Sequence, residues 1–489
     1  MNYPVIVIAV GIYAFWLAMM VLVHRKFGEM RSSRLPMTLT FYTLGAVGPL
    51  FLLSKKEINI STPGWMKTLR KKLSFLLKRR GGDADTDRLR ISFIGQDGTT
   101  SEPARGEGKA LKTAGSVLQD AIQEGATDVH FEPEPDQLKV RYRIDGMLQF
   151  RHSYPPDLAP GVVSSLKVLA GEDMAERRRS QDGSFGAILD GRSIDFRTAT
   201  TGTSHGEKMV VRILDKKAQL RNLENLGMRK GTFRKLKSLV ERPSGMLMAC
   251  GPTGSGKSTT LYAALQEVDT IARNVITIED PIEYQLDNIT QLNINERAGI
   301  TFAKLLRNTL RQDPDILMVG EIRDKDTAEI AMQAALTGHF VYTTVHANDT
   351  VSSIFRLLDL SVKPYLIASS VSAILAQRLV RTLCTNCKVA RDPTEEELEN
   401  LPIDRSKVDK LYDPVGCDEC FGTGYRGRTG VFELLEFNEE LQDLVQNEPS
   451  IPQIKNAARK AGLVSLRQDA LVKALQGVTS LQEAIRVTR

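Results

Sequence analysis

The chain has 489 residues, a net charge of +6 and 42% hydrophobic residues, which is enough for two to four domains with buried cores. The positive charge is local: residues 1–80 hold 13 Lys or Arg and two acidic residues, while residues 81–489 carry a net charge of −5. This distribution argues against a dedicated nucleic-acid-binding surface, so no direct nucleic-acid partner is expected.

Residues 1–56 are predicted to be membrane segments. Residues 4–23 carry no charge and are long enough for a transmembrane helix. A cleavable signal peptide is disfavoured, because neither a basic leading segment nor an A-x-A cleavage site is present. A second uncharged stretch, 35–54, contains Gly45, Gly48 and Pro49 and is expected to be transmembrane or re-entrant. A hairpin is slightly favoured by its length, although its basic loop would lie outside, against the positive-inside tendency.

Residues 57–80 are predicted to form a basic amphipathic helix. Trp65, Leu69 and Leu73 recur at helical spacing among lysines and arginines, a pattern typical of a helix lying on anionic lipid. A solvated charged helix is the alternative. Residues 81–108, rich in Gly, Asp, Ser and Thr, are expected to be a linker in which 88–95 could form one short strand.

Two α/β domains are predicted after the linker, at 109–220 and 221–489. Hydrophobic periodicity in the first predicts helices at 114–124 and 159–169. Alternating apolar residues and turn signals predict its strands at 128–132, 138–144, 147–150, 185–189, 193–200 and 208–213. The turn Asp145-Gly146 is expected to join two of them as a hairpin.

The second domain contains a phosphate-binding loop. The motif GxxxxGK[ST] is met in full by Gly251, Pro252, Thr253, Gly254, Ser255, Gly256, Lys257, Ser258 and Thr259. An apolar run at 245–250 predicts a strand before it, and 257–268 predicts a helix after it. In such a loop backbone N–H groups surround a polyphosphate, the lysine reaches the β- and γ-phosphates, and the serine binds Mg²⁺. The chain is therefore expected to bind a nucleoside triphosphate.

Carboxylates follow two further predicted strands of this domain. The run 274–280 ends in Glu279 and is followed by Glu283, where Mg²⁺ ligands or a water-orienting base are expected. The apolar strand 316–319 is followed by Gly320 and Glu321. An ordinary Walker B strand ends in an aspartate; here Gly320 occupies that position and Glu321 supplies the carboxylate.

Histidines flank a third predicted strand, 340–345, with His339 before it and His346 after it. A capping carboxylate or a surface histidine is the structural alternative for each of these residues. Parallel strands, however, end on the same edge of a sheet, where ligands bind. Together the segments therefore favour a phosphoryl-transfer site.

Four cysteines form two CxxC pairs, Cys384 with Cys387 and Cys417 with Cys420. This spacing favours tetrahedral, structural Zn²⁺ in an insert at 383–421. Disulfides are disfavoured in a cytoplasmic domain, and an iron–sulfur cluster is the weaker alternative. The acidic stretch between the pairs is expected to be an exposed helix. Cys250, in the apolar strand before the loop, is expected to be a core residue.

In their order along the chain, these segments resemble one family, the secretion ATPases that power type II secretion and type IV pilus assembly. The resemblance covers residues 107–489. Besides the phosphate-binding loop and the cysteines, the matching segments are 125–133, 140–146, 181–183, 205–208, 279–284 (the family's Asp box), 310–324 (its Walker B region), and 337–339 through 346–349 (its His box).

The resemblance implies a PAS-like N-terminal domain, a RecA-like ATPase domain and a ring hexamer with ATP between the two domains. Glu321 would be the main catalytic carboxylate and Glu279 the partner of Mg²⁺ and water. His339 and His346 would contact or sense the γ-phosphate, and Arg197 and Arg212 would close over the nucleotide. The motor would act on an inner-membrane platform protein and add pilin or pseudopilin subunits.

The N-terminus departs from the family, whose usual members dock on an inner-membrane partner through a soluble domain. Direct anchoring to the bacterial inner membrane, with the catalytic domains on its cytoplasmic face, is the hypothesis. A pilus retraction motor is disfavoured, because such enzymes usually lack the tetracysteine insert. A motor for DNA uptake or conjugation-associated pili stays open. A membrane-tethered nucleotide-binding regulator would not need the whole set of catalytic residues.

Overall fold

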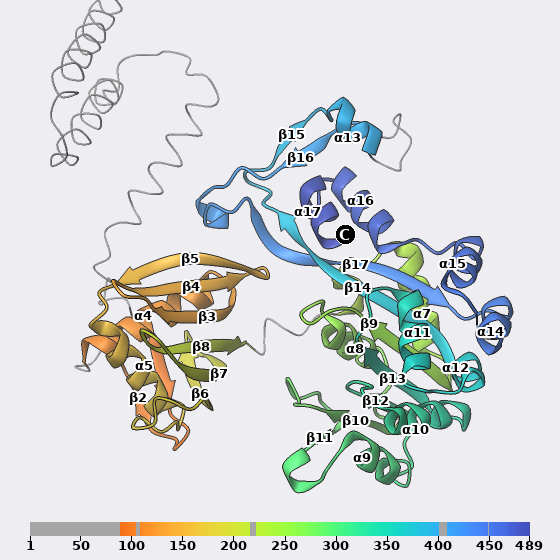
Figure 1. Ribbon diagram of the computed structural model, residues 1–489, viewed down its shortest axis with the longest axis horizontal. Coiled ribbons are helices and arrows are strands. Elements are labelled where there is room, and N and C mark those ends of the chain that lie inside the picture. Colours follow the sequence, from red (N-terminus) through yellow and green to blue (C-terminus); the bar gives the residue numbers. More distant parts are fainter. Residues whose placement is uncertain (1–88, 104–107, 216–221, 401–407, 448) are drawn as a thin grey trace, which may run out of the picture. The chain divides into compact units, whose positions relative to one another are not determined.

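A computed structural model describes residues 89–103, 108–215, 222–400, 408–447 and 449–489 (Figure 1). The membrane segments and the basic helix predicted within 1–80 lie outside these residues. Among the helices of the described residues, none combines the length and the apolar character needed to cross a membrane. The described chain forms two bodies, 89–215 and 222–489, each with its own sheet.

The first body is built on an eight-stranded antiparallel sheet in the order β2-β1-β6-β7-β8-β3-β4-β5. Its strands are β1 (Ile91–Ile94), β2 (Thr100–Ser101), β3 (Ala126–Pro133), β4 (Leu138–Ile144), β5 (Met147–Tyr154), β6 (Gln181–Leu189), β7 (Arg192–Thr203) and β8 (Gly206–Leu214). Helices α4 (Lys109–Gln123) and α5 (Leu158–Leu169) pack together on one face of it (Figure 1). Alternate residues of β4 are buried, as expected of a strand with one covered face.

The expected short strand within 88–95 is present as β1, and it is part of the core. Ile91 and Phe93 are buried, and β1 pairs with β6 along its whole length. The sheet therefore begins upstream of residue 109. The predicted hairpin is also present: Asp145 and Gly146 both have positive φ, at +50° and +83°, which suits the tight turn between β4 and β5.

The second body is built on a seven-stranded sheet in the order β11-β10-β12-β13-β9-β14-β17. Its strands are β9 (Gly245–Cys250), β10 (Val275–Glu279), β11 (Thr290–Asn293), β12 (Ile316–Val319), β13 (Phe340–Val345), β14 (Val371–Leu383) and β17 (Tyr425–Glu436). All neighbours are parallel except β14 and β17, which form a long antiparallel pair. Every residue of β10, β12 and β13 is buried, because helices cover both faces.

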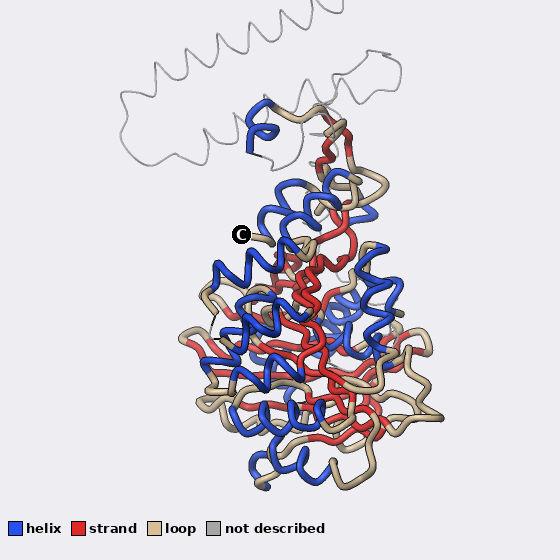
Figure 2. Tube along the Cα trace, turned by 90° about the vertical axis from the view of Figure 1, so that its right-hand side faces the viewer, coloured by secondary structure: helices blue, strands red, loops and turns tan. Residues whose placement is uncertain are grey.

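Two hydrophobic clusters occupy the two faces of this sheet, and Figure 2 shows the strands running between helices. The helices are α7 (Lys230–Val240), α8 (Lys257–Leu265), α9 (Phe302–Thr309), α10 (Lys325–Leu336), α11 (Thr350–Asp359), α12 (Pro364–Ser370), α14 (Glu439–Gln446), α15 (Ile451–Lys460), α16 (Leu466–Leu475) and α17 (Leu481–Val487). Single 3₁₀ turns occur at Leu223–Leu226, Glu296–Ala298 and Asp418–Cys420.

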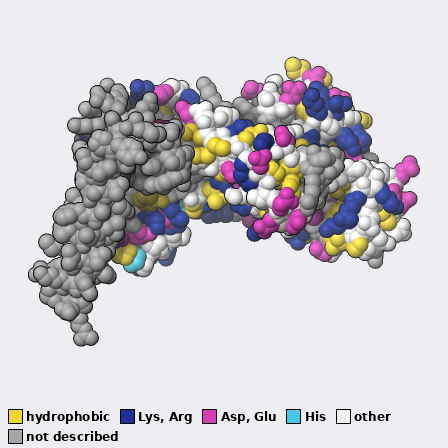
Figure 3. All heavy atoms as spheres, turned by 90° about the horizontal axis from the view of Figure 1, so that it is seen from above, with side chains coloured by type: hydrophobic (Ala, Val, Ile, Leu, Met, Phe, Trp, Pro, Cys, Tyr) yellow, Lys and Arg dark blue, Asp and Glu magenta, His cyan; other side chains and the backbone are white. Residues whose placement is uncertain are grey.

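The cysteine-bearing insert lies between β14 and β17. It contains a two-stranded sheet of β15 (Val389–Arg391) and β16 (Leu411–Asp413) and the predicted acidic helix, α13 (Glu395–Asn400). Arg391 holds this small unit together by binding Glu397 and Asp413 at 2.6 and 2.7 Å. Basic and acidic side chains are interspersed over the part of the face that Figure 3 colours by type.

Candidate nucleotide site and cysteine cluster

The phosphate-binding loop connects β9 to α8, as the motif predicts. Its glycines adopt backbone conformations that other residues rarely take, with φ of +152° at Gly251, +76° at Gly254 and +88° at Gly256. The loop also lies directly against β14: a Cβ at Gly251 would come 2.6 Å from the carbonyl oxygen of Gln377, and one at Gly256 would come 2.8 Å from its Nε2. Both torsion and space therefore require glycine here.

Lys257 is the first residue of α8, at the helix end that attracts anions. Its Nζ donates hydrogen bonds to the carbonyl oxygens of Gly251 and Pro252, at 2.9 and 3.2 Å. Burial lowers the pKa of this ammonium from its ordinary value. Gln377 supports the helix from the side, since its Oε1 accepts from Thr260 Oγ1 at 2.7 Å.

A cavity of about 150 Å³ opens beside this loop. It is lined by Lys257, Ser258, Leu261, Tyr262, Glu279, Asp280, Pro281, Glu283, Phe302, Met318, Gly320, Glu321, Thr344 and His346. The parallel register explains this convergence, because β10, β12 and β13 all end at the same edge of the sheet. Lys257, Ser258, Glu279, Glu283, Glu321 and His346 are thus brought together as the sequence predicts.

Glu321 has charged partners at the cavity. One oxygen is hydrogen-bonded to Arg323, which also lies 3.6 Å from Asp280, and the other is 3.3 Å from His346 Nε2. The pKa of the Arg323 guanidinium is raised by the bond to Glu321. Gly320 fits closely against the neighbouring strand: a Cβ there would lie 3.1 Å from the carbonyl oxygen of Ile278, which is a tight contact. Glycine in place of the usual aspartate therefore lets β12 end close against β10, with Glu321 next in the chain.

Glu279 lies deeper, at 4% exposure, among neutral donors. One carboxylate oxygen accepts from Thr277 Oγ1 at 2.6 Å and from Gln291 Nε2 at 3.0 Å. The other accepts from the hydroxyl of Tyr262 on α8. The cavity thus holds two carboxylates in contrasting surroundings, Glu321 beside a guanidinium and an imidazole and Glu279 among neutral donors.

Three predicted residues, His339, Arg197 and Arg212, do not line this cavity. His339 precedes β13 and His346 follows it, so the strand separates them by about 20 Å at about 3.3 Å per residue. His339 Nδ1 instead lies 2.9 Å from the carbonyl oxygen of Ala334, at the end of α10. His339 therefore stands at the opposite edge of the sheet from Lys257 and does not line this cavity, and its role toward the γ-phosphate stays a prediction.

Arg197 and Arg212 belong to the first body, where they face each other across β7 and β8. Arg212 Nε lies 3.0 Å from Asp128 Oδ1. Neither arginine lines the cavity.

Two functional candidates, Tyr262 and Arg323, were not singled out from the sequence. Arg323 stands two residues after Glu321, within the segment that carries the resemblance. Tyr262 stands five residues after Lys257 and reads as an ordinary apolar residue of a buried helix. Only the tertiary structure, which turns its hydroxyl toward Glu279, distinguishes it.

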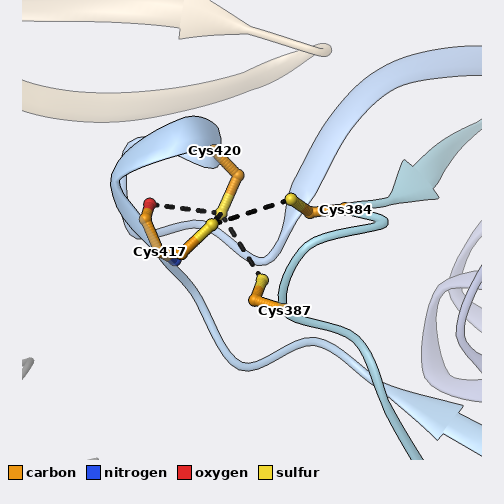
Figure 4. A group of neighbouring side chains, drawn as sticks. All are labelled: Cys384, Cys387, Cys417 and Cys420. Carbon is orange, nitrogen blue, oxygen red and sulfur yellow. Dashed lines mark hydrogen bonds between the residues drawn. The ribbon is translucent and has the colours of Figure 1, made fainter.

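The four cysteines gather at the end of the β14–β17 pair (Figure 4). Their sulfur atoms all lie within 4.8 Å of one another, and three of the separations are 3.8, 3.8 and 3.7 Å. A tetrahedron with Zn–S bonds of about 2.3 Å has sulfur atoms about 3.8 Å apart. The separations therefore fit a shared metal ion.

Backbone N–H groups also point at these sulfur atoms. Gly416 N donates to Cys387 Sγ at 3.3 Å, and Cys417 N and Gly424 N donate to Cys420 Sγ at 3.1 and 3.2 Å. Burial raises the pKa of Cys387 and Cys417. At Cys420 burial acts in the same direction, but the hydrogen bonds to its sulfur outweigh it and bring that pKa to about 7. Thiolates are the form in which cysteines bind metals, and N–H groups directed at sulfur favour that form.

Comparison with known proteins places the chain in a family. The model of the family described as "Type II/IV secretion system protein" matches residues 104–486. The chain is 46% identical over 382 residues to the type II secretion system ATPase E of Vibrio cholerae, covering 78% of this chain and 75% of that protein. It is 42% identical over 413 residues to the type IV pilus assembly ATPase PilB of Pseudomonas aeruginosa, covering 83% and 72%.

Among solved structures, the chain is similar to the pilus retraction motor PilT with bound ADP. The TM-score is 0.52 at 25% identity, covering 76% of this chain and 95% of PilT. The span that the family model matches, residues 104–486, contains the phosphate-binding loop, both carboxylates and the cysteine cluster described above. The protein therefore belongs to the type II/IV secretion system family of ATPases.

Proposed function

We propose that this protein is the ATP-hydrolysing motor that drives the assembly of pilin or pseudopilin subunits, in type IV pilus biogenesis or type II secretion. The observation that carries the proposal is the convergence of Lys257, Ser258, Glu279, Glu321 and His346 on one cavity at the end of parallel strands. A protein that only bound nucleotide would need the first two residues but not the acid–histidine set.

The roles of these residues follow from their positions. The loop N–H groups and Lys257 bind the β- and γ-phosphates of ATP, and Ser258 and Glu279 would hold Mg²⁺, which neutralises phosphate charge. Glu321 is the catalytic carboxylate that orients or deprotonates the attacking water, with Glu283 at the cavity wall. His346, at 3.3 Å from Glu321, is placed to sense the γ-phosphate through that carboxylate.

We further propose that the first body, 89–215, which extends the predicted domain upstream to β1, is the PAS-like domain, and that the second body, 222–489, is the RecA-like ATPase domain, working as a ring hexamer. Arg197 and Arg212 close over a nucleotide held between the two domains. Their direct pairing across two strands supports this, because it presents two guanidinium groups on one patch of the sheet. Nucleotide then changes the relative stability of open and closed domain arrangements, which is how hydrolysis produces movement.

The cysteine cluster binds one structural Zn²⁺ through Cys384, Cys387, Cys417 and Cys420, within the insert 383–421. Four sulfur ligands leave no open coordination position, so the ion would stabilise the end of the β14–β17 pair and take no part in hydrolysis.

The location proposed is the cytoplasmic face of the bacterial inner membrane, where the motor acts on a platform protein. The uncharged stretches 4–23 and 35–54 and the basic segment 57–80 support a direct membrane anchor that contacts anionic lipid. The predicted linker 81–108 would connect this anchor to the catalytic domains, although its strands β1 and β2 belong to the sheet of the first body.

A retraction motor is the rival within the family. The identities of 42–46% to proteins named for secretion or pilus assembly, against 25% to the retraction motor PilT, favour assembly. The two functions have opposite consequences in the cell. Loss of an assembly motor removes surface pili or stops secretion, whereas loss of a retraction motor leaves pili that accumulate.

The test deletes the gene in its own bacterium and then reintroduces one of four full-length forms: wild type, Lys257→Ala, Glu321→Gln or Lys325→Ala. Lys325→Ala is the control, because Lys325 lies on an exposed helix end. We expect the deletion to abolish pili or secretion, and wild type and Lys325→Ala, but neither Lys257→Ala nor Glu321→Gln, to restore them. Accumulated pili in the deletion strain would establish the retraction motor instead. Full restoration by Lys257→Ala would overturn the proposal, because neither a motor nor a nucleotide-binding regulator works without the phosphate-binding lysine. Full restoration by Glu321→Gln would support the regulator.

A further inference from the structure

The hydroxyl of Tyr262 makes a direct polar link between two motifs that the sheet keeps apart. Tyr262 belongs to the helix of the phosphate-binding loop, which follows β9. Glu279 ends β10, and β12 and β13 lie between β10 and β9 in the sheet. The side chain of Tyr262 is 1% exposed, and its hydroxyl donates to Glu279 Oε2 across this separation.

The position of the Tyr262 ring is fixed by packing. It meets the ring of Tyr284 edge to face, with centroids 4.6 Å apart and an interplanar angle of 89°. Burial, followed by the hydrogen bond to Glu279, raises the pKa of Tyr262 well above its ordinary value, so the hydroxyl keeps its proton and acts as a donor. The aromatic contact and the hydrogen bond therefore hold the segment after β10 against α8.

Counting acceptor positions on Glu279 shows what the hydroxyl does. A carboxylate offers about two acceptor positions on each oxygen. Oε1 already accepts from Thr277 and Gln291, and the amide of Gln291 is itself oriented, because its Oε1 accepts from the backbone N–H of Leu286 at 2.7 Å. Oε2 accepts from Tyr262, which leaves one position, and the direction of the Tyr262 bond decides where that position points.

We propose that Tyr262 is a positioning residue for ATP hydrolysis, which directs the one remaining acceptor position of Glu279 into the cavity beside Lys257. The group that occupies this position is a water molecule or the Mg²⁺ ion that Glu279 would hold with Ser258. The inference rests on the proposed ATPase function and adds a residue that acts through Glu279 without touching the nucleotide. It also ties phosphate binding at α8 to the placement of the carboxylate.

The test compares steady-state ATP hydrolysis by the full-length wild type and Tyr262→Phe, which keeps the ring and removes the hydroxyl. We expect kcat to fall about 10- to 100-fold, because small misplacements of catalytic groups have effects of this size, while KM for ATP changes less than about twofold. Tyr342→Phe is the matched control: Tyr342 is a fully buried tyrosine of β13 whose hydroxyl has no hydrogen-bond partner in the described structure. Its kcat should equal that of wild type.

A second comparison asks whether Tyr262 acts through Glu279. In a Glu279→Gln background, Tyr262→Phe should lower kcat by less than about twofold, because a positioning residue has nothing left to position. The same 10- to 100-fold loss in that background would overturn the proposal, as would a raised KM with unchanged kcat. If wild type and Glu321→Gln hydrolyse ATP equally slowly, the proposed function fails; if they differ and Tyr262→Phe equals wild type, only the inference fails.

Discussion

Asp469 provides the sharpest test of how the C-terminal helices are held on the ATPase domain. This carboxylate is fully buried in α16, where it lies 2.8 Å from Arg229 Nε and 3.0 Å from Lys473 Nζ and accepts from the backbone N–H of Phe432 at 2.9 Å. It thus joins α16 to the residue before α7 and to β17. Asp469→Asn keeps the shape but leaves the ammonium of Lys473, whose side chain is 7% exposed, without a counter-charge.

Removing one partner of a buried ion pair costs about 3–5 kcal/mol. In a domain of this size 1 kcal/mol corresponds to about 2 °C in Tm, so the main transition should fall by about 6–10 °C in a thermal melt. Adding Lys473→Met removes the stranded charge and should recover part of the loss. Lys460→Met, in an exposed pair with Glu440 at 3.9 Å, is the control and should shift Tm by less than about 2 °C. An Asp469→Asn melt within 2 °C of wild type, or no recovery in the double variant, would refute the reasoning.

Two further predictions concern the cysteine cluster and the C-terminal helix α17. The purified full chain should contain one zinc ion per molecule by elemental analysis. Cys420→Ser should lose the zinc, whereas Cys250→Ala, a change at the buried cysteine of β9, should retain it. A metal-free wild type would rule out the zinc site. Glu483 has a pKa of about 2, because hydrogen bonds from Arg486 and Arg381 outweigh burial, which alone would raise it. Its ordinary pKa is 4.5, so this stabilisation is complete above pH 4.5 and is lost as the pH falls toward 2. Glu483→Gln should therefore lower Tm most at neutral pH, and a gap between the two melting curves that does not narrow from pH 6 to pH 3 would contradict this.

Much of the site could be predicted from the sequence, because its chemistry is encoded locally. The loop glycines, Lys257 and the apolar strand before them are contiguous, so the strand–loop–helix unit follows from a short motif. Glu279, Glu321 and His346 each follow a short apolar run, and the rule that parallel strands end at one edge is enough to bring them together. The CxxC spacing predicts the sulfur cluster in the same way.

The rest depends on contacts between distant segments. His339 and His346 flank the same strand, and proximity in sequence suggested a shared role, although a strand puts its two ends about 20 Å apart. The hydroxyl of Tyr262 meets Glu279 only because α8 packs over the sheet. Strand β1 pairs with β6, almost 100 residues further on, and no local pattern in a Gly- and Ser-rich stretch signals such a partner.

The central claim is that the cavity hydrolyses ATP through Glu321, and the most direct measurement is the turnover of ATP by full-length Glu321→Gln. We expect its kcat to fall at least about 100-fold while it still binds a fluorescent ATP analogue, because the amide cannot accept a proton but leaves the phosphate-binding loop intact. Glu329→Gln, a neighbouring glutamate paired with Lys325 on α10, should turn over ATP as wild type does. A Glu321→Gln protein that hydrolyses ATP at the wild-type rate would contradict the account.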